Sequence, residues 1–265
     1  MLIRAKTDKI VEDIVERMDV LKTWKIYTYL IFTYIIMQIG SIYLGQSLIE
    51  YFKADESLSL QEAKYYGVAW SLFSVNLLAT IIFLLLVFPN KRFFQVFKGK
   101  ASSIGKTILW GFIGFFLALI GQMAAGMLEA ALFGIEPGSE NTALLSDIAK
   151  VAPIIIVSMV IFAPILEEVI FRRVLFGGLY QKTNFIIAAL VSAIVFAAVH
   201  GELQHLLIYM APALVFSYIY YRTKRLLAPI IAHLLMNGFV VIIQLNIEKI
   251  EQFQKLHEVV ITWLN

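Results

Sequence analysis

The stretch that decides the fold reads ILEEVIFRR, residues 165–173. It places Glu167, Glu168, Arg172 and Arg173 inside an otherwise apolar run that starts near residue 151. Ionisable side chains are costly in hydrocarbon and usually mark function when they occur within a membrane-spanning helix. The stretch therefore raises two questions: whether the run crosses a membrane, and what the four charges do there.

The composition places the whole chain in a membrane. Of its 265 residues 60% are hydrophobic and 15% are charged, and the mean hydropathy is +0.80. Soluble domains contain roughly 45–50% apolar residues. Several windows approach the twenty or so apolar residues that a helix needs to cross a bilayer. We expect an all-α, polytopic helical membrane protein with about seven transmembrane helices, eight being the upper count, and amphipathic terminal helices.

The apolar spans divide the chain into regions. They are read at about 24–45, 67–89, 107–133, 152–181, 185–200, 206–221 and 227–247. Before them, apolar residues recur at helical spacing between Ile10 and Leu21, which predicts an amphipathic helix at the membrane face. We expect N-terminal membrane helices of unassigned role over 1–150, a catalytic core over 151–247 and an amphipathic tail over 248–265, all within one integrated membrane domain.

The basic residues predict the orientation. Most Lys and Arg residues precede the first span or fall in the connections near 91–106, 172–182 and 222–225, whereas the connections 46–66 and 134–150 are acidic and polar. By the positive-inside rule the N-terminus is cytoplasmic. The net charge of +3 thus reflects topology, and we expect no nucleic-acid partner. The absence of cysteine excludes disulfides and thiolate chemistry.

Spacing separates the charges of the opening stretch. Glu168 and Arg172 stand four residues apart in the favourable order on a helix, so they are predicted to neutralise each other. Arg173 is predicted to extend toward the inner interface. The residue four positions after Glu167 is Phe171, so Glu167 has no partner on its own helix.

One further polar group falls at the depth of Glu167, and two others lie nearer the inner side. Glu167 lies about sixteen residues before the turn at 181–184 and His200 about sixteen after it, so both are about 24 Å from that turn along a helical pair. His233 and Asn237 are four apart on one face of the last span. Helix tilt and a cavity opening toward the inner side would bring all four to one level.

This set of groups fits two kinds of hydrolysis. Glu167 and His200 are suited to activate a water molecule, while His233 and Asn237 are donors for the oxyanion of an attacked carbonyl. Alternatively, Glu167, His200 and His233 would bind zinc and leave a position open for water. Spacing alone does not decide between metal-free and zinc-dependent cleavage.

Other polar residues and motifs are assigned no chemistry. The chain has no HExxH or GxSG motif, and no aspartate falls within an apolar span. Glu202 and His205 are interpreted as solvated at the interface. Glu129 and Asn76 are interpreted as packing or groove residues.

Three segments together resemble a known family. EEVIFR (167–172), FAAVH (196–200) and HLLMN (233–237) are similar to the motifs EExxxR, FxxxH and HxxxN of the CPBP or Abi family. That family contains type II CAAX prenyl endoproteases and bacteriocin-processing or self-immunity membrane proteins. The resemblance implies a glutamate intramembrane endopeptidase without a cofactor, with catalytic Glu167, His200, His233 and Asn237 and supporting Glu168 and Arg172.

The resemblance also implies a setting and a substrate. Short connections are typical of a multi-pass enzyme of a bacterial plasma membrane, so the expected partners are the lipid bilayer and a membrane-associated peptide or small-protein substrate. The main alternative is a non-catalytic immunity or scaffold protein of the same fold. A transporter is disfavoured because no paired half-repeats with broken helices are found.

Overall fold

The structure is a computed structural model that describes residues 2–136, 138–253 and 255. Within these residues it is built of helices and contains no strand, which confirms the all-α membrane fold. The long helices are α1 (Leu2–Lys53), α2 (Leu60–Val87), α3 (Ile104–Phe133), α9 (Leu206–Thr223) and α10 (Leu227–Leu245). The shorter ones include η1 (Lys91–Phe94), α4 (Glu140–Val151), α8 (Phe185–Ala198) and η4 (Leu203–His205).

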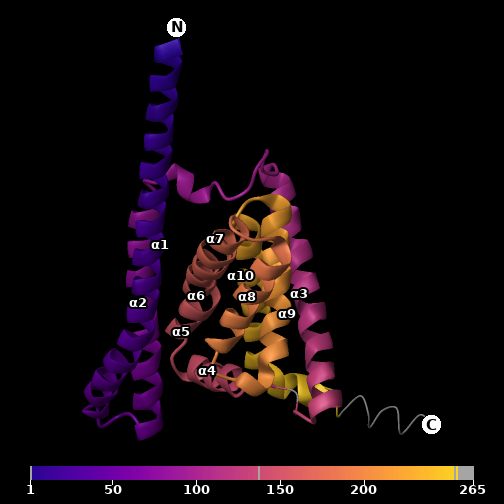
Figure 1. The fold of residues 1–265 in the computed structure, drawn as a ribbon. Coiled ribbons are helices and arrows are strands. Elements are labelled where there is room, and N and C mark those ends of the chain that lie inside the picture. Colours follow the sequence, from indigo (N-terminus) through magenta and orange to yellow (C-terminus); the bar gives the residue numbers. More distant parts are fainter. Residues whose placement is uncertain (1, 137, 254, 256–265) are drawn as a thin grey trace, which may run out of the picture.

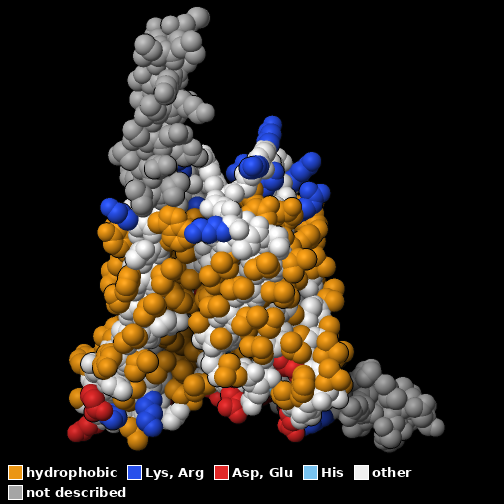
Figure 2. Space-filling model, viewed as in Figure 1, with side chains coloured by type: hydrophobic (Ala, Val, Ile, Leu, Met, Phe, Trp, Pro, Cys, Tyr) orange, Lys and Arg blue, Asp and Glu red, His pale blue; other side chains and the backbone are white. Residues whose placement is uncertain are grey.

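Each of the seven predicted apolar spans is a helix. Six are long and apolar enough to cross a membrane: Thr23–Lys53, Leu60–Val87, Ile104–Phe133, Ile154–Tyr180, Leu203–Thr223 and Leu227–Leu245. The remaining one, α8, has 14 residues and therefore measures about 21 Å, less than the hydrocarbon thickness of about 30 Å. Figure 2 shows an apolar band around the molecule. Basic side chains gather at the end of the molecule where the α2–α3 connection lies, and acidic side chains lie at the opposite end.

The amphipathic character predicted for the chain ends concerns residues outside the described ones, and one outward connection differs from the predicted pattern. The N-terminal helix is continuous with the first span as α1, while its predicted amphipathic face concerns side chains before residue 23, outside the described ones. The tail is helical over 247–253, and most of its predicted helix also lies outside the described residues. The connection 134–150 was predicted to be a polar loop, which is wrong: it contains α4, whose N-terminus is capped by Ser139.

The helices form two groups, visible in Figure 1 as an α1–α2 hairpin beside a bundle that is flanked on its far side by α3. The hairpin closes tightly at Gly67, where a Cβ would lie 2.7 Å from the backbone nitrogen of Ile49. On the other side, Cβ atoms at Gly111 and Gly114 would clash with side chains of α10 and α9. Small residues thus permit the close helix contacts that stabilise membrane bundles.

The fourth span is not the uninterrupted α-helix that its sequence predicts. It runs through α5 (Ile154–Val157), the π-helix η2 (Ser158–Phe162), α6 (Ala163–Glu167), the π-helix η3 (Glu168–Phe176) and α7 (Gly177–Tyr180). π-helical turns are uncommon and are frequent at functional sites. Glu167 therefore ends a single α-helical turn between two π-helices.

Candidate active site

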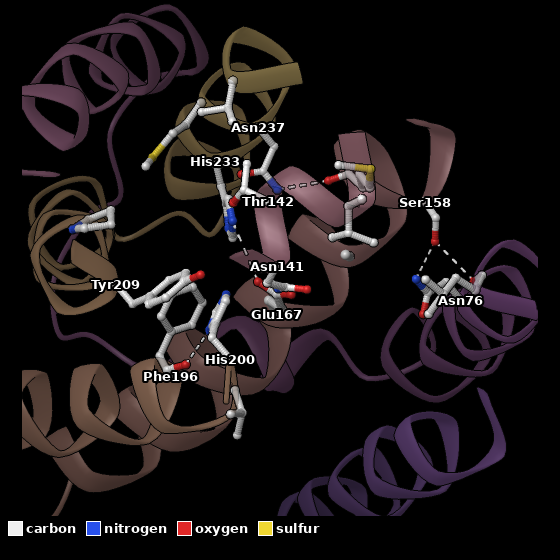
Figure 3. A pocket seen from close by; sticks show the side chains of 18 of the residues that line it. Asn76, Asn141, Thr142, Ser158, Glu167, Phe196, His200, Tyr209, His233 and Asn237 are labelled. Atoms are coloured by element: carbon white, nitrogen blue, oxygen red, sulfur yellow. Dashed lines mark hydrogen bonds and ion pairs between the residues drawn. The ribbon is translucent and has the colours of Figure 1, made fainter. Parts of the chain in front are cut away.

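One cavity collects the polar groups of the predicted site. It has a volume of about 420 Å³, within the range of roughly 300–1,000 Å³ typical of ligand sites. Glu167, His200, His233 and Asn237 all line it, together with residues of α1 to α4 and α9 (Figure 3). The sequence predicted a cavity opening toward the basic end. The lining instead includes Asn141 of α4, at the acidic end, and no residue of the basic connections.

His233 lies between the two neighbouring glutamates. Its Nδ1 is 2.8 Å from Oε1 of Glu168, and its Nε2 is 3.7 Å from Oε2 of Glu167. The ring stacks on Phe216 with centroids 4.9 Å apart. The side chain of Glu167 is 17% exposed, and it makes no hydrogen bond to any described residue. Its carboxylate is therefore available to a molecule in the cavity.

His200 is oriented by its own helix end. Its Nδ1 lies 2.7 Å from the carbonyl oxygen of Phe196. Because a carbonyl only accepts, this contact requires an Nδ1–H and leaves the lone pair of a neutral ring on Nε2. The C-terminal end of α8 thus presents a hydrogen-bond acceptor within the same cavity as Glu167 (Figure 3).

Asn237 is fixed by the irregular backbone of the fourth span. Its Nδ2 donates to the carbonyl oxygen of Met159 over 2.9 Å. Met159 belongs to η2, whose π-helical turn changes the usual backbone pairing. A side-chain amide has two donor hydrogens, so the second one of Asn237 remains for a group in the cavity.

Glu168 and Arg172 form the predicted ion pair, sealed away from the cavity. Arg172 Nε is 3.2 Å from Glu168 Oε2, and both side chains are 0% exposed. The guanidinium also lies over the rings of Phe196 and Phe216, at 4.5 and 5.1 Å. No described residue forms a hydrogen bond of good geometry with its nitrogens, so charge and ring contacts hold it.

The predicted extension of Arg173 to the interface is wrong. Its side chain is fully buried and donates to the carbonyl oxygen of Phe93 and to the hydroxyl of Tyr27. The guanidinium lies over both rings as well. Helix α1 and η1 cover this end of the fourth span, which the local sequence does not reveal.

The zinc alternative does not fit the side-chain arrangement. It requires Glu167, His200 and His233 to converge on one ion. Within the described part of the chain, no three His, Cys, Asp or Glu side chains are grouped so that they could hold a metal ion.

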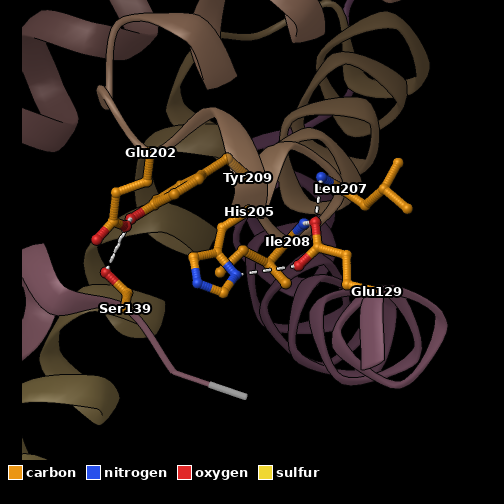
Figure 4. Close-up of polar contacts among 7 residues, drawn as sticks. All are labelled: Glu129, Ser139, Glu202, His205, Leu207, Ile208 and Tyr209. Atoms are coloured by element: carbon orange, nitrogen blue, oxygen red, sulfur yellow. Dashed lines mark hydrogen bonds and ion pairs between the residues drawn. The ribbon is translucent and has the colours of Figure 1, made fainter. Parts of the chain in front are cut away.

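Several polar residues that the sequence left without a role are engaged beside the cavity (Figure 4). The interpretation of His205 as a solvated interfacial residue is wrong, whereas Glu202 is partly exposed. Glu202 accepts hydrogen bonds from α4 and from Tyr209, and His205 is buried against Glu129. Tyr209 itself lines the cavity and was not singled out, because it belongs to no motif.

Comparisons with known proteins agree with the three motifs. A family model described as "Type II CAAX prenyl endopeptidase Rce1-like" matches residues 149–239. The chain is 41% identical over 222 residues to "Putative membrane peptidase YdiL" of Bacillus subtilis, an alignment that covers 84% of this chain and 90% of the relative. The chain belongs to the CPBP family.

Further relatives of this CPBP protein match shorter stretches. The "Membrane-embedded CAAX protease MroQ" of Staphylococcus aureus is 42% identical over 163 residues, or 59% of this chain and 64% of the relative. The "UPF0177 protein YvdC" of Lactococcus lactis is 28% identical over 175 residues, or 62% and 64%. No solved structure matches. The names of the first two relatives support a protease-type function for this multi-pass membrane protein.

Proposed function

We propose that this CPBP protein is an endopeptidase that hydrolyses a peptide bond of a membrane-associated peptide or small protein. The observation that carries the proposal is the cavity shared by Glu167, His200, His233 and Asn237, which come from three separate segments of the chain. Glu167 makes no hydrogen bond to a described residue and its one ion-pair contact, to His233, is long at 3.7 Å; such a carboxylate inside a membrane helix usually marks a functional site.

In the proposed reaction, Glu167 and His200 hold the attacking water. The carboxylate of Glu167 and Nε2 of His200 are both acceptors, so one water molecule donates a hydrogen to each and turns a lone pair toward the substrate carbonyl. Glu167 takes the proton as the water attacks, and general-base assistance of this kind contributes about 10²–10⁴-fold. The same proton is then delivered to the leaving amine.

The oxyanion of the tetrahedral intermediate is assigned to the opposite wall. Asn237 contributes the amide hydrogen that Met159 does not use. His233 contributes an Nε2–H, which its ring carries either as an imidazolium between the two carboxylates or when Glu168 holds the proton toward Nδ1. Donors fixed before the reaction stabilise the developing charge without reorganisation.

The proposed setting is the plasma membrane of a bacterium, with a cytoplasmic N-terminus. The basic end of the apolar band then faces the cytoplasm. The cavity lies closer to the acidic end, so the scissile bond is reached from within the bilayer or from the α4 side.

Comparative peptidomics of membranes tests this function. Cells producing the wild-type protein are compared with cells producing Glu167→Gln at matched membrane levels. We expect a set of membrane-associated peptides present only with the wild-type protein. Identical peptide sets, with both proteins folded, would instead favour a non-catalytic immunity or scaffold role.

A further inference from the structure

The connection between α8 and α9 carries His200 and is held from two sides (Figure 4). On one side, Glu129 of α3 accepts from the backbone N–H groups of Leu207 and Ile208, at 2.6 and 3.3 Å, and contacts Nδ1 of His205 at 3.2 Å. A buried carboxylate at a helix N-terminus satisfies free donors and the helix dipole. This contact fixes the start of α9 against α3.

On the other side, the N-terminus of α4 is attached to Glu202. Ser139 donates to Glu202 Oε2 over 2.8 Å, and the backbone N–H of Asn141 donates to Oε1 over 2.8 Å. The loop before α4 contains two glycines at positive φ, Gly134 at 65° and Gly138 at 138°. Such backbone conformations are readily adopted only by glycine. The attachment through Glu202 thus lies directly after a turn that is built on glycines.

Tyr209 connects this attachment to the catalytic histidine of the proposed function. Its hydroxyl donates to Glu202 over 2.5 Å and lies 3.0 Å from the hydroxyl of Ser139. Its ring stacks on the imidazole of His200, with centroids 4.2 Å apart and planes at 28°. Phe196 contacts the same imidazole at 4.7 Å. The imidazole therefore cannot rotate unless one of these two rings moves.

We infer that Tyr209 is a positioning residue for His200, and that Glu202 and Ser139 make this position depend on the docking of α4 over the cavity. When α4 is docked, the hydroxyl of Tyr209 is held and its ring keeps Nε2 of His200 facing Glu167. When α4 lifts, Tyr209 loses its polar partners and the imidazole gains rotational freedom. The helix that lines the acidic end of the cavity thereby also controls the water-activating group. The catalytic consequence rests on the proposed function, whereas the coupling itself does not.

The first test observes His200 directly and needs no substrate. In detergent-solubilised protein with isotope-labelled histidine, the His200 ring signals are assigned by their loss in His200→Gln. We expect Tyr209→Leu to move these signals strongly, because the stacked ring is gone, and Tyr209→Phe and Glu202→Gln to broaden or shift them. Tyr218→Phe on α9 is the matched control, since Tyr218 is exposed and no hydrogen bond of its hydroxyl occurs among the described residues.

The second test observes α4. Because the chain has no cysteine, Leu145→Cys places a single thiol on the cavity face of α4. We expect Glu202→Gln and Tyr209→Phe to raise its rate of maleimide labelling by about tenfold, as lost hydrogen bonds to a charged group predict. Glu140→Gln removes a carboxylate from the same helix end without removing such a bond, and should leave the rate unchanged.

The third test measures turnover of a peptide found by peptidomics. Misplacement of a catalytic group by about 1 Å costs up to about 10²-fold, so Tyr209→Leu should lower kcat by about that factor with KM nearly constant. Tyr209→Phe should lower it less. Unchanged His200 signals in Tyr209→Leu, or unchanged labelling in Glu202→Gln, would overturn the inference. If His200→Gln cleaves at the wild-type rate, the water-activating role proposed for His200 fails, while the first two readouts still decide the coupling.

Discussion

Glu167 and Glu168 are neighbours in the chain, yet they belong to two different regions of the molecule. Glu167 faces the cavity, is 17% exposed and makes no hydrogen bond to a described residue. Glu168 faces the sealed side, is 0% exposed, and contacts Arg172 and His233. Two identical side chains one residue apart thus have different surroundings: Glu168 is held by Arg172 and His233 inside the protein, whereas Glu167 contacts His233 at 3.7 Å and faces the cavity.

The boundary between these two regions is the change from α6 to η3. His233 contacts both regions, because its Nδ1 contacts Glu168 and its Nε2 faces Glu167. The sealed region therefore orients a group of the cavity, so it supports the site while remaining out of reach of substrate.

Removal of the buried cation should have the largest effect on stability. Arg172→Met leaves Glu168 buried without its ion-pair partner, and a broken buried pair typically costs about 3–5 kcal/mol. Unfolding in detergent should show this loss. The double variant Glu168→Gln/Arg172→Met should recover part of it, because no unpaired charge remains. Arg222→Met, at an exposed position of α9, is the control. Equal stability of the single and double variants would contradict the ion-pair account.

Removal of one oxyanion donor should affect the cavity region alone. Asn237→Ala is expected to lower kcat by about 10²–10³-fold, the usual effect of losing such a donor. Its unfolding should change far less than that of Arg172→Met. Steady-state kinetics on a purified peptide substrate measures kcat and KM separately. A change in KM with unaltered kcat would assign Asn237 to substrate binding instead.

Acid pH should loosen the docking of α4. Partial burial alone would raise the pKa of Glu202, but hydrogen bonds from Tyr209, Asn141 and Ser139 outweigh it and hold the pKa below its ordinary value of 4.5. Because the pKa of Glu202 is lower in the folded protein, the ionised carboxylate stabilises the docking of α4 fully above pH 4.5. This stabilisation is lost as the pH falls through the pKa of the folded state. Nearby His205 adds to the lowering.

Labelling of Leu145→Cys as a function of pH measures this effect. The rate, corrected for thiol ionisation, should rise only in the acid range, and Glu202→Gln should remove that pH dependence. Because Glu202 is largely solvated, we expect a smaller change than for the two preceding variants. A pH-independent rate in the unsubstituted background would contradict the assignment to Glu202.

Chelation should have the smallest effect. The side-chain geometry does not fit zinc, so cleavage by purified protein should be unchanged after extended dialysis against a chelator. Loss of activity that added zinc restores would contradict the metal-free mechanism.

Much of the fold and the convergence of the four polar groups could be predicted from the sequence. Hydropathy predicts where the helices lie along the chain. The number of residues between each group and the turn at 181–184 predicts its depth in the membrane, and this count predicts that Glu167 and His200 lie at the same level. These are one-dimensional quantities that a single chain encodes directly. The catalytic roles of these residues remain predictions.

The remaining features depend on contacts between distant segments. Arg173 donates hydrogen bonds to Tyr27 and Phe93, which lie 146 and 80 residues away in the sequence. The residues next to Arg173 in the sequence therefore do not predict its burial. Glu202 reaches Asn141 across 61 residues. The π-helical turns differ in this respect, because Pro164 at the start of α6 cannot donate a backbone hydrogen bond and is a local signal of an irregular helix.

The most direct measurement compares Glu167→Gln with Glu168→Gln in purified protein, recording both cleavage rate and unfolding. We expect Glu167→Gln to lose about 10²–10⁴-fold in kcat and to unfold like the unsubstituted protein. Glu168→Gln should be clearly less stable, because Arg172 then lacks its counter-charge. Full cleavage by Glu167→Gln, or a loss of stability equal to that of Glu168→Gln, would contradict the division between a reactive and a structural carboxylate.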